Sequence, residues 1–184
     1  MRKVLITGTA GFIGFHLAEL LLNEGFIVLG FDSLNDYYDV SLKNARNQLL
    51  GQHKNYSFTH AKLEDFEVLR KLVAQEKPDI IISLAAQAGV RYSLENPRAY
   101  IESNIVGAFN IMECAREFGV EHLLMASTSS VYGSNKEMPY SELHKVDNPM
   151  TIYAASKKAN EVMSHSYAHL YDCLLYTSPS PRDA

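Results

Sequence analysis

The sequence predicts an α/β fold built on a doubly wound parallel sheet. Short apolar runs rich in β-branched residues alternate along the chain with segments of helical periodicity. The run DIIISLAA at residues 79–86 lacks polar alternation, which is typical of a strand buried on both faces of a parallel sheet. Strands that alternate with helices, joined by right-handed crossovers, give such a sheet with helices on both sides.

Five strands are expected, each followed by a helical segment. The strands are expected at residues 3–7, 26–32, 56–60, 79–86 and 122–128. The helices are expected at residues 15–24, in a short piece of 33–55, and at 66–75, 98–118 and 152–171. Pro78 ends the helix before it, because the residue that precedes a proline disfavours helical geometry. Gly119 supplies the left-handed residue that ends the helix at 98–118.

Composition narrows the function classes. The 184 residues suit one compact domain, or one domain and part of another. The chain has 17 basic and 21 acidic residues and a net charge of −4, so its charge does not indicate nucleic-acid binding. The seven histidines lack the spacing of metal ligands. Cys114 and Cys173 lie far apart, which argues against a disulfide framework or a zinc site and favours a reducing compartment. Since neither a leader nor a membrane span is recognisable, we expect a cytoplasmic protein without a membrane partner.

The stretch GTAGFIG joins the first strand to the first helix and carries Gly8, Gly11 and Gly14. In a Rossmann fold, glycines at this spacing permit a tight turn, a close approach to a pyrophosphate and close helix packing. A glycine triplet alone could be only a turn before a packed helix. Asp32 follows at the end of the second strand, where a carboxylate can accept hydrogen bonds from a ribose. Because Asp32 would repel a 2′-phosphate and no arginine follows it, the pattern predicts NAD rather than NADP.

A second motif, YAASK, places Tyr153 and Lys157 four residues apart at the start of a helix. This spacing puts both side chains on one face of the helix. A tyrosine can act as a base at neutral pH only where positive charge stabilises its phenolate. Upstream, a strand ends in the hydroxyl side chains of residues 127–130, at the sheet edge where ligands bind. Either feature alone is common, since a serine-rich strand end often caps its own loop. Their order after a dinucleotide fingerprint favours catalysis.

The GxxGxxG pattern, STSSVYG and YAASKKANE resemble the extended short-chain dehydrogenase/reductase family of nucleotide-sugar epimerases and dehydratases. Within it, DSLNDYYDVSLKNAR and LAAQAGVRYSLENP resemble the UDP-glucuronate 4-epimerases, over residues 1 to about 172. The resemblance implies that Tyr153 is the base, that Lys157 is its electrostatic partner and that Thr128 shares the substrate 4′-OH. It also implies a homodimer through the helices at 98–118 and 152–171.

The resemblance further implies two sets of binding residues. The NAD site would comprise Gly8, Gly11, Phe12, Ile13, Gly14, Asp32, Asn35, Lys62, Leu63, Leu84, Ala85, Ala86, Asn104, Tyr153 and Lys157. The substrate site would comprise Arg91, Ser127, Thr128 and Ser129, although Arg91 could equally pair with Glu95. Two positions depart from the family. Lys62 replaces an acidic residue that touches the adenine amine, and Ser83 replaces a common histidine.

The implied reaction is the NAD-dependent interconversion of UDP-glucuronate and UDP-galacturonate through a transient 4-keto sugar. The related 4,6-dehydratases carry Asp-Glu after the catalytic threonine, and the decarboxylases carry Glu at the second of these positions. This chain has Ser129 and Ser130 there, which disfavours elimination and decarboxylation. Two alternatives stay open. The chain could serve UDP-glucose 4-epimerisation, or it could be an NAD-binding module without turnover.

The C-terminal tail differs in character from the rest of the chain. We expect an NAD-binding domain at residues 1–172 and a tail outside the family at 173–184, with the C-terminal substrate domain absent. Pro179 and Pro181 forbid a helix or a central strand, so Thr177 to Ala184 is expected to be disordered. Without a substrate lobe to exclude water, the chain is expected to bind NAD weakly and to epimerise nothing.

Overall fold

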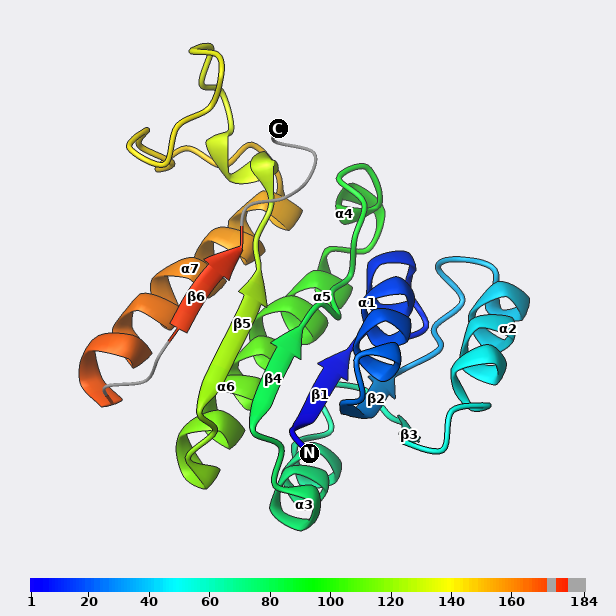
Figure 1. The fold of residues 1–184 in the computed structure, drawn as a ribbon. Coiled ribbons are helices and arrows are strands. Elements are labelled where there is room, and N and C mark those ends of the chain that lie inside the picture. The colour runs from blue at the N-terminus through cyan, green and yellow to red at the C-terminus, as the bar shows by residue number, and fades with distance from the viewer. Residues whose placement is uncertain (172–174, 179–184) are drawn as a thin grey trace.

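The computed structural model of the chain describes residues 1–171 and 175–178. A six-stranded sheet in the order β3-β2-β1-β4-β5-β6, with every neighbouring pair parallel, forms its centre (Figure 1). The doubly wound parallel sheet predicted from the sequence is therefore confirmed. The strands are β1 (Lys3–Thr7), β2 (Ile27–Asp32), β3 (Tyr56–His60), β4 (Ile80–Ser83), β5 (His122–Ala126) and β6 (Leu175–Ser178).

Helices cover both faces of the sheet (Figure 1). They are α1 (Phe12–Asn23), α2 (Val40–Leu50), α3 (Phe66–Glu76), α4 (Tyr92–Glu95), α5 (Pro97–Tyr100), α6 (Gly107–Phe118) and α7 (Ile152–Tyr171), with a π-helix η1 (Ile101–Val106) and a 3-10 helix η2 (Ser129–Tyr132). Helices α1 and α2 contribute to one apolar cluster, and α3 and α6 to a second. Within β1, Val4 and Ile6 join the first cluster and Leu5 the second, which is the period-two alternation of a strand buried on both faces.

The predicted helix at 98–118 is one continuous helical stretch in three pieces, two α-helices with a π-helix between them. Asn96 caps its start by accepting a hydrogen bond from the Ala99 N–H, and Pro97 takes the first helical position. A π-helical turn, η1, then separates α5 from α6, and Gly119 ends α6 at φ +62° as predicted. A single wide turn leaves the apolar spacing almost unchanged, so hydrophobic periodicity could not predict it. Such turns are frequent at functional sites.

Two strands end earlier than predicted. Strand β4 ends at Ser83 rather than at residue 86, because the N–H groups of Leu84 and Ala85 donate to the Thr7 side chain at 3.2 and 3.1 Å. Strand β5 ends at Ala126, so the hydroxyl residues that follow lie in a loop and in η2. Each segment begins at the carboxyl edge of the sheet, where loops can bind ligands.

The sixth strand corrects the expectation for the tail. Thr177 and Ser178 belong to β6, whose backbone pairs with β5 from Leu123↔Leu175 to Ala126↔Ser178. The two tail prolines come after the last paired residue, so their missing N–H groups interrupt no bond of this ladder. Residues 172–174 and 179–184 lie outside the described residues. The predicted domain boundary at 172 and the disorder expected for 179–184 stay predictions.

Candidate functional site

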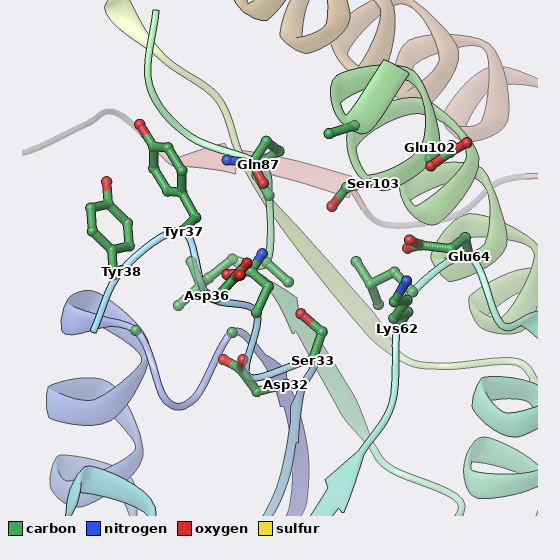
Figure 2. Close-up of a pocket in the computed structure, with 18 of the residues that line it drawn as sticks. Asp32, Ser33, Asp36, Tyr37, Tyr38, Lys62, Glu64, Gln87, Glu102 and Ser103 are labelled. Atoms are coloured by element: carbon green, nitrogen blue, oxygen red, sulfur yellow. The ribbon is translucent and has the colours of Figure 1, made fainter. Parts of the chain in front are cut away.

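A cavity of about 380 Å³ opens at the carboxyl edge of the sheet, where the strand order reverses between β1 and β4 (Figure 2). Such a switch point is where open α/β sheets bind their ligands. Nine of the residues predicted for the NAD site line the cavity: Gly8, Gly11, Asp32, Asn35, Lys62, Leu63, Leu84, Ala85 and Ala86. Four segments far apart in the sequence thus meet around one cavity.

The glycine-rich loop between β1 and α1 leaves no room for side chains at two of its glycines. Gly8 has φ +80°, and a Cβ added there would lie 3.0 Å from the Ala85 nitrogen. A Cβ on Gly14 would lie 2.1 Å from the Gly8 oxygen, so α1 packs directly against the loop. Helix α1 begins at Phe12, and the Phe12 and Ile13 side chains are exposed. These two residues can therefore contribute the backbone N–H groups of a helix N-terminus, which favour an anion.

Asp32 is held rigidly at the end of β2. One carboxylate oxygen accepts from the Ala10 N–H at 3.0 Å and the other from the Leu34 N–H at 2.8 Å, and the residue is buried. A carboxylate oxygen has a second lone pair, so each can accept one further hydrogen bond. The geometry suits a pair of ribose hydroxyls.

Two cations beside Asp32 were missed by the sequence interpretation, which considered only an arginine close after it. Both come from α2. The buried Lys43 ammonium donates to the backbone and side-chain oxygens of Asn35, each at 2.6 Å. Burial lowers the pKa of Lys43, and the charges of Asp32 and Asp36 act in the other direction. The Arg46 guanidinium donates to the Ala10 carbonyl at 3.1 Å.

The segment after β3 forms another wall of the cavity. Leu63 is fixed there because its carbonyl accepts from the Asn110 side chain at 2.8 Å and because Gly107 leaves room for its side chain. Lys62, which replaces the acidic residue of the family, lines this wall. Glu64, which the sequence interpretation did not single out, lines it as well (Figure 2). A carboxylate is therefore present near the position from which the family's acidic residue is missing.

Asn104 is buried in η1 and does not line the cavity. Its side chain accepts from the Gln87 N–H at 2.7 Å and donates to the Gln87 carbonyl at 3.1 Å and to the Ser156 hydroxyl at 3.0 Å. Gln87 itself lines the cavity. Asn104 therefore fixes the loop after β4 and connects it to α7.

Tyr153 and Lys157 lie one turn apart on α7, as predicted, next to this loop rather than in the cavity wall. The edge of the Tyr153 ring packs against Tyr100, with ring centroids 6.0 Å apart, and the Tyr100 hydroxyl donates to the Ala88 carbonyl at 2.9 Å. Burial lowers the pKa of Lys157 to about 8, while the charge of Glu161 acts to raise it. A protonated lysine in this position would stabilise a Tyr153 phenolate.

Two of the hydroxyl residues after β5, Ser127 and Thr128, form side-chain hydrogen bonds with protein groups. The Thr128 side chain accepts from the Ser130 N–H at 3.2 Å and so caps η2, which also contains Ser129. The Ser127 hydroxyl donates to the Glu161 carboxylate. Thr128 keeps its own hydroxyl proton for another acceptor. Contact of these residues with a substrate stays a prediction.

Arg91 directly precedes α4, and its side chain is exposed. Across the part of the chain that the structure describes, no ion pair joins it to Glu95. Its proposed contact with a substrate carboxylate stays a prediction.

Residues 1–171 and 175–178 contain neither a candidate metal cluster nor a candidate membrane-spanning helix. Within them, no group of three or more His, Cys, Asp or Glu side chains could hold a metal ion. No helix in the same residues is long and apolar enough to cross a membrane.

Comparison with known proteins places this site in context. The family described as GDP-mannose 4,6 dehydratase matches residues 5–179. A probable UDP-glucuronate 4-epimerase of Rhizobium meliloti is 52% identical over 169 residues, which are 92% of this chain and 50% of that protein. The chain thus spans about half the length of this curated relative.

Solved structures show the same fold. The UDP-glucuronic acid 4-epimerase of Bacillus cereus, in complex with UDP-glucuronic acid and NAD, superposes with a TM-score of 0.86 at 28% identity, over 96% of this chain and 55% of the other. The UDP-glucose 4-epimerase of Thermus thermophilus, in complex with NAD, gives a TM-score of 0.83 at 33% identity, over 96% of this chain and 54% of the other.

Proposed function

We propose that this chain, which belongs to the family described as GDP-mannose 4,6 dehydratase, is the NAD-binding part of a UDP-glucuronate 4-epimerase. The observation that carries the proposal is the placement of Tyr153 and Lys157 beside a glycine-rich cavity, after a strand end without carboxylates. Ser129 and Ser130 stand where elimination would need an acid and a base. The reaction is therefore inversion at the sugar C4 rather than the dehydration in the family description.

The cavity residues fit NAD. Gly8 and Gly14 have no room for a Cβ, in the loop whose backbone would approach the pyrophosphate. The Asp32 carboxylate offers hydrogen-bond acceptors for the adenosine ribose. Bound NAD would supply a hydride acceptor and donor for the sugar C4, which makes inversion through a 4-keto sugar possible.

Three residues of this chain take part in the proton transfer, one as the base and two as its supports. Tyr153 removes the proton of the 4-OH as a phenolate, and the Lys157 ammonium stabilises that phenolate. The Thr128 hydroxyl, fixed by its cap on η2, shares a hydrogen bond with the same oxygen. Tyr153 returns the proton when the stereocentre has been inverted, so the chain leaves the reaction unchanged.

Activity is testable in a chimaera, because the chain spans half of its relative. Joining residues 1–171 to the C-terminal half of the Rhizobium meliloti relative is expected to give a protein that interconverts UDP-glucuronate and UDP-galacturonate. Chromatography of the nucleotide sugars measures both directions, with the 184-residue chain alone, expected to be inactive, as the control. Turnover of UDP-glucose only would favour the alternative that the Thermus thermophilus structure supports, and NAD binding without turnover of either sugar would favour a binding module.

Cofactor preference is testable on the chain itself. We expect NAD to bind about tenfold or more tightly than NADP, because the Asp32 carboxylate would repel a 2′-phosphate. Fluorescence titration with both dinucleotides measures this ratio. The matched variant Asp32→Asn keeps the shape and removes the charge, so the two affinities should move closer together while Lys43 and Arg46 are retained. Equal affinities in the unsubstituted chain would contradict the assignment.

We propose a UDP-sugar as the small-molecule partner and a second copy of the protein as the macromolecular one. Exposed apolar side chains on the helices support the second proposal: Val106 and Phe109 are 40% and 44% exposed, and Val162 on α7 is 55% exposed. Pairing of these helices across a dimer would cover them. A cytoplasmic location stays a prediction from the sequence.

A further inference from the structure

Glu161 joins α7 to the end of β5. One carboxylate oxygen accepts the Ser127 hydroxyl, in the residue next to Thr128. The other lies 3.2 Å from the Lys158 ammonium, and the Glu161 side chain is only 24% exposed. This carboxylate thus connects the two elements that carry the proposed catalytic side chains.

Glu161 also shares one face of α7 with Tyr153 and Lys157. The three residues follow one another at four-residue spacing, which places successive side chains about 5–6 Å apart at Cβ. Lys157 is only 6% exposed, and burial disfavours the charged form of a lysine. A carboxylate one turn away acts in the opposite direction.

We infer that Glu161 is a positioning residue: anchored by Ser127, it keeps Lys157 in the charged form that supports the Tyr153 phenolate. The inference rests on the proposed function only for what the charged lysine does. That Lys157 depends on Glu161 for its charge is a property of the folded chain and can be measured without substrate.

Other titratable groups are less able to fill this role. The elements packed against α7 carry Glu95, Arg98, Tyr100, Glu102, Glu113 and Tyr132, of which Tyr100 contacts Tyr153 and Glu113 contacts Tyr167. Arg98 and Glu102 pair with each other at 3.4 Å, and Glu95 is exposed. Burial raises the pKa of Tyr100 to about 12, so it stays neutral at physiological pH. On α7 itself, Lys158 adds a like charge, which Glu161 offsets.

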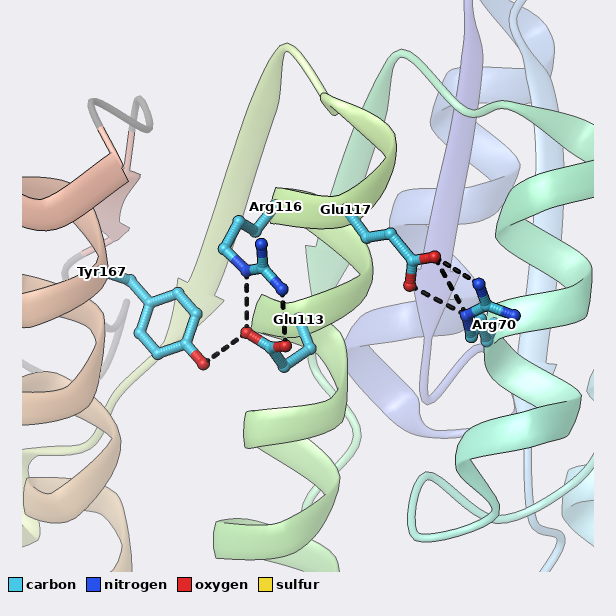
Figure 3. A network of polar contacts seen from close by, with 5 residues as sticks. All are labelled: Arg70, Glu113, Arg116, Glu117 and Tyr167. Carbon is cyan, nitrogen blue, oxygen red and sulfur yellow. Dashed lines mark hydrogen bonds and ion pairs between the residues drawn. The ribbon is translucent and has the colours of Figure 1, made fainter.

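Glu113 provides a matched control. Its carboxylate bridges α6 and α7, accepting the Tyr167 hydroxyl at 2.7 Å and pairing with Arg116 at 2.8 Å (Figure 3). Its side chain is 23% exposed, close to the 24% of Glu161. Both glutamates therefore have a hydroxyl donor, a cation and similar burial, but only Glu161 lies one turn from Lys157 on the same helix.

The experiment is the titration of Lys157 by NMR in the 184-residue chain labelled with 13C-lysine, with Lys157→Arg used to assign the signal. Glu161→Gln keeps an oxygen for the Ser127 hydroxyl and removes the charge. We expect it to move the Lys157 midpoint about one pH unit lower, as loss of a nearby opposite charge does. Glu113→Gln is expected to leave the midpoint unchanged.

Lys158→Met gives a test in the opposite direction. It removes a like charge and the cation that competes for Glu161, so the Lys157 midpoint should rise. A fall caused by Glu161→Gln together with a rise caused by Lys158→Met supports the inference. If Glu161→Gln does not fold, Ser127→Ala decides it, because this variant removes the hydroxyl that anchors Glu161 but no charge and should also lower the midpoint. A midpoint that none of these variants moves, or that Glu113→Gln moves equally, overturns it. If the midpoints move as expected but the chain binds no NAD, the proposed function fails and the inference stands.

Discussion

Tyr153→Phe is expected to lower the kcat of epimerisation by about 1,000-fold in the chimaera, within the range that a positioned acid–base group contributes. Phenylalanine keeps the edge contact with Tyr100, where the ring centroids lie 6.0 Å apart, and lacks only the hydroxyl. The affinity for NAD should change by less than about threefold, because the glycine-rich loop and Asp32 are untouched. Initial rates with UDP-glucuronate and fluorescence titration with NAD measure the two effects.

Tyr167→Phe is the control for this variant. Tyr167 lies on the same helix, but its hydroxyl donates to Glu113 on α6, away from the proposed catalytic side chains. Its removal should leave turnover within about twofold, because the hydrogen bond that is lost involves none of the proposed catalytic side chains. Substantial turnover by Tyr153→Phe would show that the base lies elsewhere, and an equal loss in Tyr167→Phe would indicate a defect of the helix rather than of the chemistry.

Much of the fold could be predicted because its signals are local. Four of the first five strands are largely apolar runs, and β3 alternates aromatic with polar residues. A run such as residues 79–86 has no polar face, so it predicts a parallel sheet by itself. Strand β6 was missed because its short run lies directly before two prolines, which dominate a local interpretation. Its pairing with β5 depends on a strand some fifty residues away, which no window of sequence contains.

Some of the residues that line the candidate cavity could be recognised from the sequence in the same way. Glycines in one motif and an aspartate at a strand end are recognisable in sequence order, and Gly8, Gly11 and Asp32 do line the cavity. Lys43 and Glu64 were missed because different elements bring them there, and nothing in their local sequence marks them. Glu161 differs from both. The four-residue spacing of Glu161 from Lys157 can be seen in the sequence, but its contact with Ser127 can be seen only in the structure.

Gly14→Ala is expected to destabilise the chain by about 3 kcal/mol or more, the upper range for forcing an extra carbon into a packed interior. The added Cβ would lie 2.1 Å from the Gly8 oxygen and 2.7 Å from the Gly8 carbonyl carbon. These are backbone atoms, and Gly8 cannot easily shift because its N–H donates to the Phe31 carbonyl at 2.7 Å. Either the loop or α1 must move, so binding of NAD should be lost together with stability. Urea unfolding followed by circular dichroism measures the change.

Gly25→Ala separates crowding from backbone strain. Gly25 has φ +84° but no atom within 4 Å of an added Cβ, so alanine there meets only the strain of the left-handed region, about 1–2 kcal/mol. In crowding, Gly11→Ala lies between these two variants, because its added Cβ would approach the Gly8 oxygen to 3.1 Å. The expected order of destabilisation is therefore Gly14→Ala above Gly25→Ala, with NAD affinity retained only in the latter. A Gly14→Ala chain that is as stable as Gly25→Ala and still binds NAD would show that α1 does not need to pack against the loop to form the site.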